Sequence, residues 1–328
     1  MPVGIYLHLP FCRVRCTYCP FAVSTDHALE DAYFEALLQE IDARASRSDV
    51  VDSLYFGGGT PSRSSLANLT RLVDRLRSRF TIAADAELTF EANPEDITAE
   101  AIAAWRALGV NRVSIGVQSF HDAELLPLGR VHGAARAREA VALAVASGMR
   151  TSLDLILGLP AQTAESFGES LAQAIAGGTG HISLYMLDLE EGTAMHAQVE
   201  RGRTMLPEND LVAALYLQAV ETLTAAGLAQ YEISNFARPG DQSRHNLRYW
   251  RREHYYGFGL GAHSFLGHAR FANTRDMQRY LEASASASDF HELLGDGEAR
   301  REAIFLNLRQ AQGIHYDELV RLCGQEGL

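Results

Sequence analysis

Short runs rich in β-branched and aromatic residues alternate with longer, helix-like stretches over the first two thirds of this 328-residue chain. Each short run is bounded by Gly, Pro, Asn or Asp, which is typical of buried β-strands. The predicted strands lie at Val3–His8, Val51–Phe56, Glu87–Glu91, Arg112–Gly116, Thr151–Ile156 and His181–Leu187. The predicted helices lie at Ala28–Ala45, Ser65–Phe80, Thr98–Leu108, Ala134–Ser147 and Ala164–Ala176.

This alternation predicts an α/β fold with parallel strands joined by helical crossovers. The even spacing of the six units favours a partial (β/α)6-type barrel over a two-domain fold. Such sheets carry their chemistry at the carboxyl ends of the strands. Unusual residues of this chain occur there, namely Cys12, Gly57–Thr60, Glu91, Gln118 and, within the fifth strand, Asp154.

The pattern changes after about Met195. The stretches that follow are a long helix, a strand-like run and an aromatic- and Gly-rich segment, at Glu208–Ala226, Tyr231–Phe236 and Tyr249–Phe265. The tail from Ser284 onward is predicted to be helical. We therefore predict a barrel core over residues 1–195 and a mostly helical region, packed on it, over residues 196–328.

The net charge limits the kinds of molecule that this protein can bind, and the use of cysteine indicates its cellular compartment. The net charge of −12 argues against a nucleic-acid partner, which would require clustered Lys and Arg. Three of the four cysteines lie within eight residues, a reduced intracellular pattern, and the distant Cys323 is interpreted as incidental. No leader and no membrane-spanning apolar run is visible, so we predict a cytoplasmic protein without membrane insertion.

The cysteine triplet follows the first predicted strand with the spacing C-x-x-x-C-x-x-C, at Cys12, Cys16 and Cys19. Each thiolate can bind one iron of a cubane cluster, and without a fourth nearby ligand one iron stays open to a small molecule. The alternatives are three buried thiols without metal, or a zinc site with His8 or His27 as fourth ligand. Zinc sites usually contain paired C-x-x-C units, so we favour the cluster.

The motif Tyr6-x-His8-x-Pro10-Phe11-Cys12, followed by Cys16, Tyr18 and Cys19, resembles the opening of one radical S-adenosylmethionine (SAM) family. This is the coproporphyrinogen oxidase-like branch, and the resemblance covers nearly the whole chain. It implies a radical SAM barrel that holds a 4Fe–4S cluster on the three cysteines. It also implies that SAM binds to the open iron.

The resemblance implies a set of SAM-binding residues near the strand ends. These are Tyr6, Tyr18, Gly58, Gly59, Thr60, Glu91, Gln118, Arg130 and Asp154. Taken singly, each polar residue of this set could instead be a hydrogen-bonded group that closes a layer of the barrel. Together, at successive strand ends, they favour a ligand site, because buried charges without partners are costly.

Two features bear on the branch of the family. Decarboxylating coproporphyrinogen oxidases carry a further Cys two residues after the triplet, where this chain has Phe21. The segment His245-Asn246-Leu247-Arg248-Tyr249-Trp250 matches the H-N-x-x-Y-W signature of the related haem chaperones. An imidazole can ligate haem iron, aromatic rings can stack on the porphyrin, and a guanidinium can pair with propionates.

The resemblance thus implies a haem site that includes His245, Asn246, Tyr249 and Trp250. From the residues alone, we favour a packed loop in which His245 and Asn246 form hydrogen bonds and the rings fill a core. The resemblance reverses this order for haem binding, but not for His245 as the axial ligand.

The resemblance implies a haem chaperone that binds a 4Fe–4S cluster, SAM and haem and delivers haem to acceptor haem proteins. The alternative is a radical SAM porphyrin-modifying enzyme, such as an oxygen-independent coproporphyrinogen III oxidase, against which Phe21 argues. A structural protein that only carries a cluster ranks third, because it would not need SAM-binding residues. Family members commonly continue into a small helical tail domain, so the interpretation leaves open whether this tail is complete.

Overall fold

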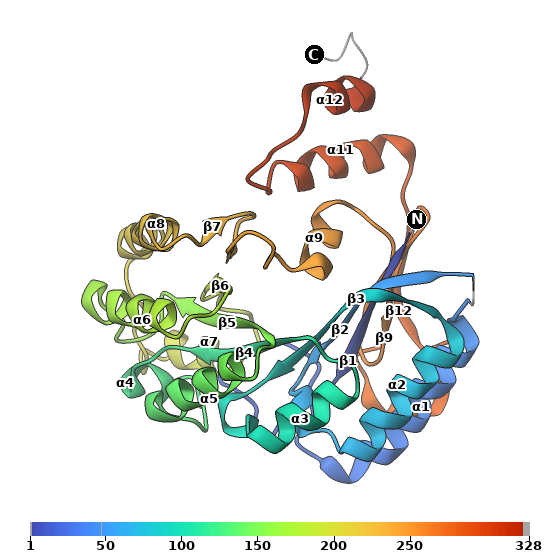
Figure 1. Cartoon of the computed structure of the whole chain (residues 1–328), viewed down its shortest axis with the longest axis horizontal. Helices are drawn as coiled ribbons and strands as arrows, with labels where there is room; N and C mark the ends of the chain where they lie inside the picture. Colours follow the sequence, from blue (N-terminus) through green and yellow to red (C-terminus); the bar gives the residue numbers. More distant parts are fainter. Residues whose placement is uncertain (1, 47, 324–328) are drawn as a thin grey trace.

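The computed structural model describes residues 2–46 and 48–323, and it confirms the predicted α/β fold (Figure 1). Within these residues, twelve strands form one sheet in the order β12-β11-β10-β9-β1-β2-β3-β4-β5-β6-β8-β7. Neighbouring strands from β1 to β6 pair in parallel, in sequence order. The sheet is curved into a partial barrel (Figure 1). The barrel is not closed, because β1 and β6 do not pair with each other: β1 pairs with β9, and β6 pairs with β8.

The parallel strands and their crossover helices lie close to the predicted bounds, except that the third strand begins six residues before the predicted Glu87. The strands are β1 (Val3–Leu9), β2 (Val50–Gly58), β3 (Thr81–Ala92), β4 (Arg112–Gln118), β5 (Arg150–Leu157) and β6 (His181–Met186). The helices are α1 (Glu30–Arg44), α2 (Leu66–Arg79), α3 (Ala99–Ala107), α5 (Ala134–Ala146) and α6 (Ala164–Ala176). Shorter elements are η1 (His27–Leu29), η2 (Pro61–Arg63), η3 (Pro94–Asp96), α4 (Asp122–Leu125) and α7 (Ala194–Glu200).

Polar side chains line the concave face of the sheet, because successive residues of a strand point to opposite faces. The parallel register places Ser53 beside Glu87 and Glu91 beside Ser114. The side chains at the alternate positions are apolar, and they are buried against the outer helices. Examples are Leu54, Phe56, Phe90, Val113 and Leu153. The barrel therefore has an apolar outer layer and a polar inner wall.

The C-terminal region is largely helical, as predicted, but it also extends the sheet at both edges. Its helices are α8 (Asn209–Ala225), α9 (Arg244–Trp250), α10 (Met277–Ala283), α11 (Asp296–Asn307) and α12 (Tyr316–Cys323). Its strands are β7 (Ala229–Gln230), β8 (Asn235–Ala237), β9 (Tyr255–Phe258), β10 (His263–Leu266), β11 (Ala269–Asn273) and β12 (Ser288–Leu293). The predicted all-helical tail is wrong in its first part, because Ser288–Leu293 pairs with β11 as the edge strand β12.

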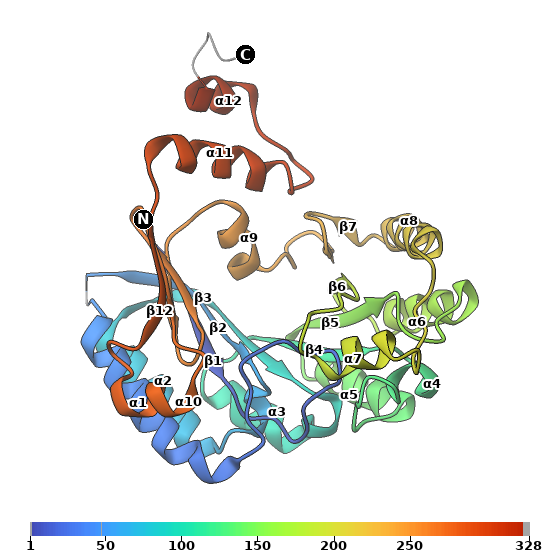
Figure 2. The ribbon, with the colours of Figure 1, turned by 180° about the vertical axis from the view of Figure 1, so that it is seen from behind.

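Figures 1 and 2 show α9 on the concave side of the sheet, with α11 and α12 beyond it. Helices α1, α2, α3 and α5 cover the opposite, convex side. None of the helices within the described ranges has the length and apolar character that crossing a bilayer requires.

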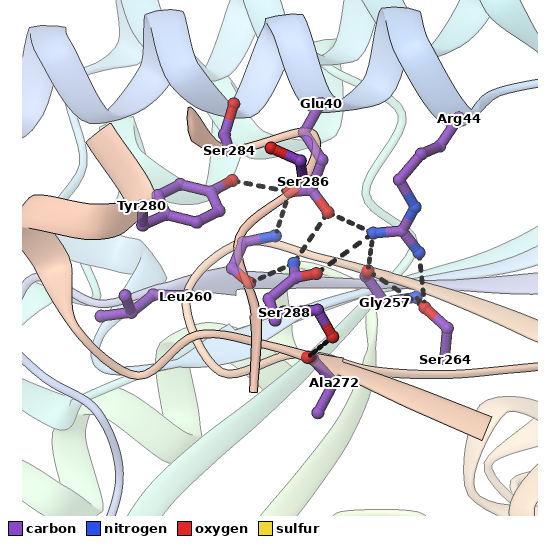
Figure 3. Close-up of polar contacts among 12 residues, drawn as sticks. Glu40, Arg44, Gly257, Leu260, Ser264, Ala272, Tyr280, Ser284, Ser286 and Ser288 are labelled. Atoms are coloured by element: carbon purple, nitrogen blue, oxygen red, sulfur yellow. Dashed lines mark hydrogen bonds and ion pairs between the residues drawn. The ribbon is translucent and has the colours of Figure 1, made fainter. Parts of the chain in front are cut away.

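A buried carboxylate on α1 joins the C-terminal strands to the core (Figure 3). Glu40 is fully buried and accepts hydrogen bonds from Tyr280 Oη at 2.7 Å, Gly259 N at 2.9 Å and Asn273 Nδ2 at 2.7 Å. Arg44, one helical turn later, forms an ion pair with the same carboxylate. Burial raises the pKa of Glu40, and the Arg44 charge opposes that rise. Three of the four partners of this buried carboxylate thus come from the C-terminal region that it anchors, and the fourth is Arg44 of the same helix.

We predict that Glu40→Ala lowers the free energy of unfolding by about 3–5 kcal/mol, because Arg44 and three hydrogen-bond donors lose a buried partner. Denaturation in urea measures this loss. The control is Glu35→Ala on the same helix, where an exposed pair with Arg71 is worth less than about 1 kcal/mol. Equal losses in the two variants would contradict the anchoring role.

Candidate functional site

The three predicted cluster cysteines lie on the loop between β1 and η1, at the carboxyl end of β1. The N–H of Cys12 donates to the Ser24 carbonyl at 2.9 Å, and the N–H of Ser24 donates to the Pro10 carbonyl at 2.8 Å. Further along, the N–H of Thr17 donates to the Leu128 carbonyl at 3.0 Å. The loop is therefore held at its two ends and in its middle.

The loop covers a cavity of about 510 Å³ at the carboxyl ends of the strands, a size typical of ligand sites. The predicted site residues that line it are Cys12, Cys16, Tyr18, Cys19, Gly58, Gly59, Thr60, Glu91, Gln118, Arg130 and Asp154. Tyr6 does not line the cavity. Its hydroxyl lies 3.2 Å from His8 Nδ1, and its ring stacks on Tyr55 deeper in the barrel.

The glycines at the end of β2, Gly58 and Gly59, are required by the packing of the chain itself. Gly58 has φ +106°, and a Cβ there would lie 2.5 Å from His8 Nδ1. A Cβ on Gly59 would lie 2.5 Å from the carbonyl carbon of Pro10, which is backbone and cannot move aside. Thr60 then donates its hydroxyl to Cys12 Sγ at 3.4 Å. The glycines thus let β2 approach the cysteine loop closely.

Two carboxyl groups face the cavity in surroundings that favour their neutral forms. Glu91 accepts from Tyr55 Oη at 2.7 Å and from Gly58 N at 3.2 Å. Burial raises the pKa of Glu91 to about 7, and the nearby Asp154 adds to the rise. Burial likewise raises the pKa of Asp154 to about 6, although Ser114 Oγ donates to it at 3.1 Å. A bound cation would favour the ionised form of both groups.

Arg130 carries the main positive charge of the inner cavity wall. Its Nη2 donates to Asn93 Oδ1 at 2.6 Å and to the Gly116 carbonyl at 2.7 Å, while Nη1 points to Cys16 Sγ at 3.5 Å. Its buried Nε has no hydrogen-bond partner among the described residues. Nearby, Gln118 has φ +67°, a conformation that costs energy for a non-glycine residue and often occurs at functional sites.

Comparisons with known proteins agree with this geometry. The model of the radical SAM superfamily matches residues 6–174. The haem chaperone HemW of Mycobacterium tuberculosis H37Rv is 39% identical over 323 residues, covering 95% of this chain and 83% of the relative. HemW of Escherichia coli K12 is 41% identical over 270 residues, covering 80% of this chain and 70% of the relative. The chain belongs to the HemW family of the radical SAM superfamily.

A solved structure shows the same fold. Coproporphyrinogen III oxidase (HemN) from Escherichia coli, a radical SAM enzyme, matches with a TM-score of 0.86 and 26% identity. The match covers 98% of this chain and 78% of that chain. The partial barrel and the C-terminal region therefore follow an established radical SAM architecture.

Membership in the radical SAM superfamily implies a 4Fe–4S cluster and SAM, and the cavity of this HemW-family chain fits both. A single zinc ion requires its thiolates to converge on one point about 2.3 Å away. Within residues 2–46 and 48–323, no group of three His, Cys, Asp or Glu side chains converges in this way. In a cubane each thiolate binds a different iron, so separated thiols around one cavity suit a cluster. The unpartnered Arg130 Nε offers a further donor to a bound ligand.

The H-N-x-x-Y-W motif lies in α9, at the end of the barrel opposite the cysteines. His245 is 1% exposed. Its Nδ1 lies 3.1 Å from Ser53 Oγ, its Nε2 lies 2.8 Å from Tyr249 Oη, and its ring stacks on Tyr55. Burial, with a contribution from Arg248, lowers the pKa of His245 to about 3. Both ring nitrogens are already hydrogen-bonded, so His245 offers no free lone pair to a haem iron in this arrangement.

The rest of the motif also forms internal contacts. Arg248 is buried and pairs with Asp52 and with Glu253, the latter at 3.2 Å. Ser243 is the N-cap of α9, and its Oγ accepts a hydrogen bond from the Asn246 N–H at 3.3 Å. Trp250 is half-buried beneath the Arg309 guanidinium, 5.9 Å from its ring centroid. The hydrogen bonds agree with the packed-loop interpretation of the motif, whereas Tyr249 and Trp250 are only partly buried. Haem binding by these residues stays a prediction.

Sequence reasoning missed several residues that shape the cavity. Tyr55 holds Glu91, Asn93 holds Arg130, and Ser114 holds Asp154. Each lies on or just after a strand, an even number of residues from another inward-facing side chain. The period-two alternation of those strands could therefore have revealed them.

We predict that Gly59→Ala displaces the cysteine loop, because the new Cβ would overlap the Pro10 backbone. Overpacking of a protein core typically costs about 1–3 kcal/mol. We therefore expect the amount of iron incorporated on anaerobic reconstitution to fall at least by half. The control is Gly297→Ala in α11, where the nearest contact of a Cβ is a side-chain tip at 3.7 Å. Full iron loading of Gly59→Ala would show that the close approach is not needed.

Proposed function

We propose that this protein is a haem chaperone that holds a 4Fe–4S cluster and SAM and transfers haem to acceptor haem proteins. The observation that carries the proposal is the cysteine cavity, in a chain whose relatives along 95% of its length are named haem chaperones. The acceptor is defined here only by its chemistry, as an apoprotein with an empty haem pocket. We place the protein in the cytoplasm, where thiols stay reduced.

In this proposal Cys12, Cys16 and Cys19 hold the cluster, and the open iron of the bound cluster chelates SAM. The backbone of Gly58 and Gly59, with Thr60, forms the wall nearest the cluster. SAM carries ammonium and sulfonium charges, which the Glu91 and Asp154 carboxylates complement.

The remaining SAM residues have three different parts in the proposal. Arg130 and Tyr18 line the cavity beside Cys16, where Arg130 meets the carboxylate of SAM or the cluster thiolate. Gln118 borders the cavity from the end of β4. Tyr6 does not line the cavity and acts indirectly, by stacking on Tyr55, which donates a hydrogen bond to Glu91.

The domain proposal is a radical SAM core with a packed C-terminal region. Met195 of α7 is buried with Leu128, Ile156 and Leu159 of the core. We therefore place the end of the core after α7, at Glu200, a few residues beyond the boundary drawn from sequence. The C-terminal region then supplies α8 to α12 and both edges of the sheet.

The second candidate function is oxygen-independent coproporphyrinogen III oxidation, favoured by the structural likeness to HemN. Phe21 stands where those decarboxylating enzymes carry a further cysteine. It is 57% exposed at the cavity mouth, so a thiol is missing where a substrate would enter. This departure makes the chaperone the better-supported function.

An anaerobic experiment with the cluster-loaded chain separates the two functions. We expect saturable haem binding near micromolar affinity, or about −8 kcal/mol, as suits a carrier that must release its cargo. We expect no protoporphyrinogen from coproporphyrinogen III with SAM and a strong reductant. Turnover on the order of 1 per second, a common enzymatic rate, would reject the chaperone function. Failure of the cluster-loaded chain to bind haem would reject it as well.

SAM affinity is expected to rise with pH across neutrality. Glu91 and Asp154, with pKa values of about 7 and about 6, are increasingly protonated below neutrality and then cannot pair with a cation. Affinity should therefore be highest above about pH 8 and fall, at most tenfold per pH unit and carboxyl group, toward about pH 5. Equilibrium dialysis of SAM at constant cluster content measures the profile.

The matched variants are Glu91→Gln, which should weaken binding and flatten the profile around pH 7, and Glu190→Gln at the cavity rim. Glu190 has no part in the proposed SAM contacts, so its variant should keep the wild-type profile. A pH profile that Glu91→Gln leaves unchanged would assign the titration to another group.

A further inference from the structure

Exposed apolar side chains gather around the mouth of the cysteine cavity. Phe21 (57% exposed), Met186 (51%), Tyr185 (43%), Val131 (42%) and Val14 (41%) all line it. They come from three places in the fold: the cysteine loop, the turn after α4 and the end of β6. Large apolar side chains that remain exposed around a cavity mark a site for an apolar ligand or partner.

We propose that this mouth is the haem-docking face of the chain, with Met186 as a ligand of the haem iron. Arg13 and Arg15 would pair with the haem propionates. The placement rests on the proposed chaperone function, for which it names the cargo site. Haem is the occupant because the mouth combines an apolar rim with two adjacent cations, and haem combines a flat apolar ring with two carboxylates.

The charges around the mouth are distributed unequally. Arg13 and Arg15 are exposed, line the cavity and form no hydrogen bond or ion pair with any described residue. Unpaired guanidinium groups are available for bidentate pairing with carboxylates. Asp188 and Glu190, beyond the end of β6, line the same cavity and would repel propionates. The propionates are therefore oriented toward the cysteine loop, and the apolar edge of the ring toward β6.

The iron ligand follows from the side chains that line the cavity. Haem iron is bound in proteins by His, Cys, Met or Tyr, and no histidine is among the lining residues. The three cysteines are committed to the cluster, and a tyrosine must lose a proton of pKa about 10 to ligate. The Met186 thioether binds without losing a proton, and it is half exposed at the rim. The histidine of the H-N-x-x-Y-W motif is enclosed at the other end of the barrel.

The test is a haem titration of the full chain with its cluster, under anaerobic reducing conditions, with visible and resonance Raman spectra. Met186→Leu conserves volume and should retain one haem while its ligand-dependent bands change. The matched control is Met205→Leu, because Met205 is 83% exposed and does not line the cavity. Its spectra should equal those of the wild type.

The propionate contacts are tested from both sides. The double variant Arg13→Gln, Arg15→Gln should raise the haem Kd about tenfold, or about 1.4 kcal/mol. Haem dimethyl ester, which lacks the carboxylates, should bind the wild type about tenfold more weakly than haem. The same ester should bind the double variant as tightly as haem does, because the ion pairs that the ester cannot form are already absent from this variant.

Each result bears on a different claim. Haem binding by the wild type with unchanged bands in Met186→Leu overturns Met186 as the ligand, while the chaperone function stands. An ester that binds the wild type as tightly as haem overturns the propionate placement. No haem binding by the wild type removes the proposed function itself. Cluster content and Tm, measured for every variant, identify any loss that comes from misfolding.

Discussion

The polar inner wall of an open barrel is the constraint on which the rest of this structure depends. Polar groups that are buried on the concave face of the sheet must find hydrogen-bond partners, since each unpaired group costs free energy. At the amino ends of the strands, the buried Arg112 lies 3.7 Å from Glu87 and donates to the Asp241 carbonyl at 2.9 Å. Glu87 in turn accepts from the N–H of His245 at 3.2 Å. The segment that leads into α9 therefore completes the inner wall at this end.

At the carboxyl ends the same wall is left incomplete by the chain. Glu91, Asp154 and Arg130 have some partners there, but they border a cavity instead of a packed segment. Burial raises the pKa of both carboxyl groups toward neutrality, and Arg130 keeps a buried Nε without a partner. The polar groups at the amino end of the barrel are thus paired within the protein, whereas those at the carboxyl end border a cavity that can admit a ligand.

The two ends are also linked through side chains. Tyr55 donates to Glu91 and stacks on His245, whose ring is held by Ser53 and Tyr249. The H-N-x-x-Y-W motif thereby supports the cavity from below, which gives it a structural role whatever the position of the haem. The buried Glu40 network fixes β9 to β11 in the same way, from the convex side.

The sequence alone determined the six strand–helix units, the cysteine loop and most of the cavity residues, because these signals are local. Runs of β-branched and aromatic residues, the Gly, Pro, Asn or Asp residues that bound them, and the cysteine spacing act over a few positions, and parallel βα units bring the carboxyl ends of their strands together. Only the tertiary structure decided what α9 contacts. A histidine beside aromatic residues reads alike as a haem ligand or as a buried hydrogen-bonding group. The choice depends on Ser53 and Tyr55, which lie nearly two hundred residues away in sequence and meet His245 only in the folded barrel.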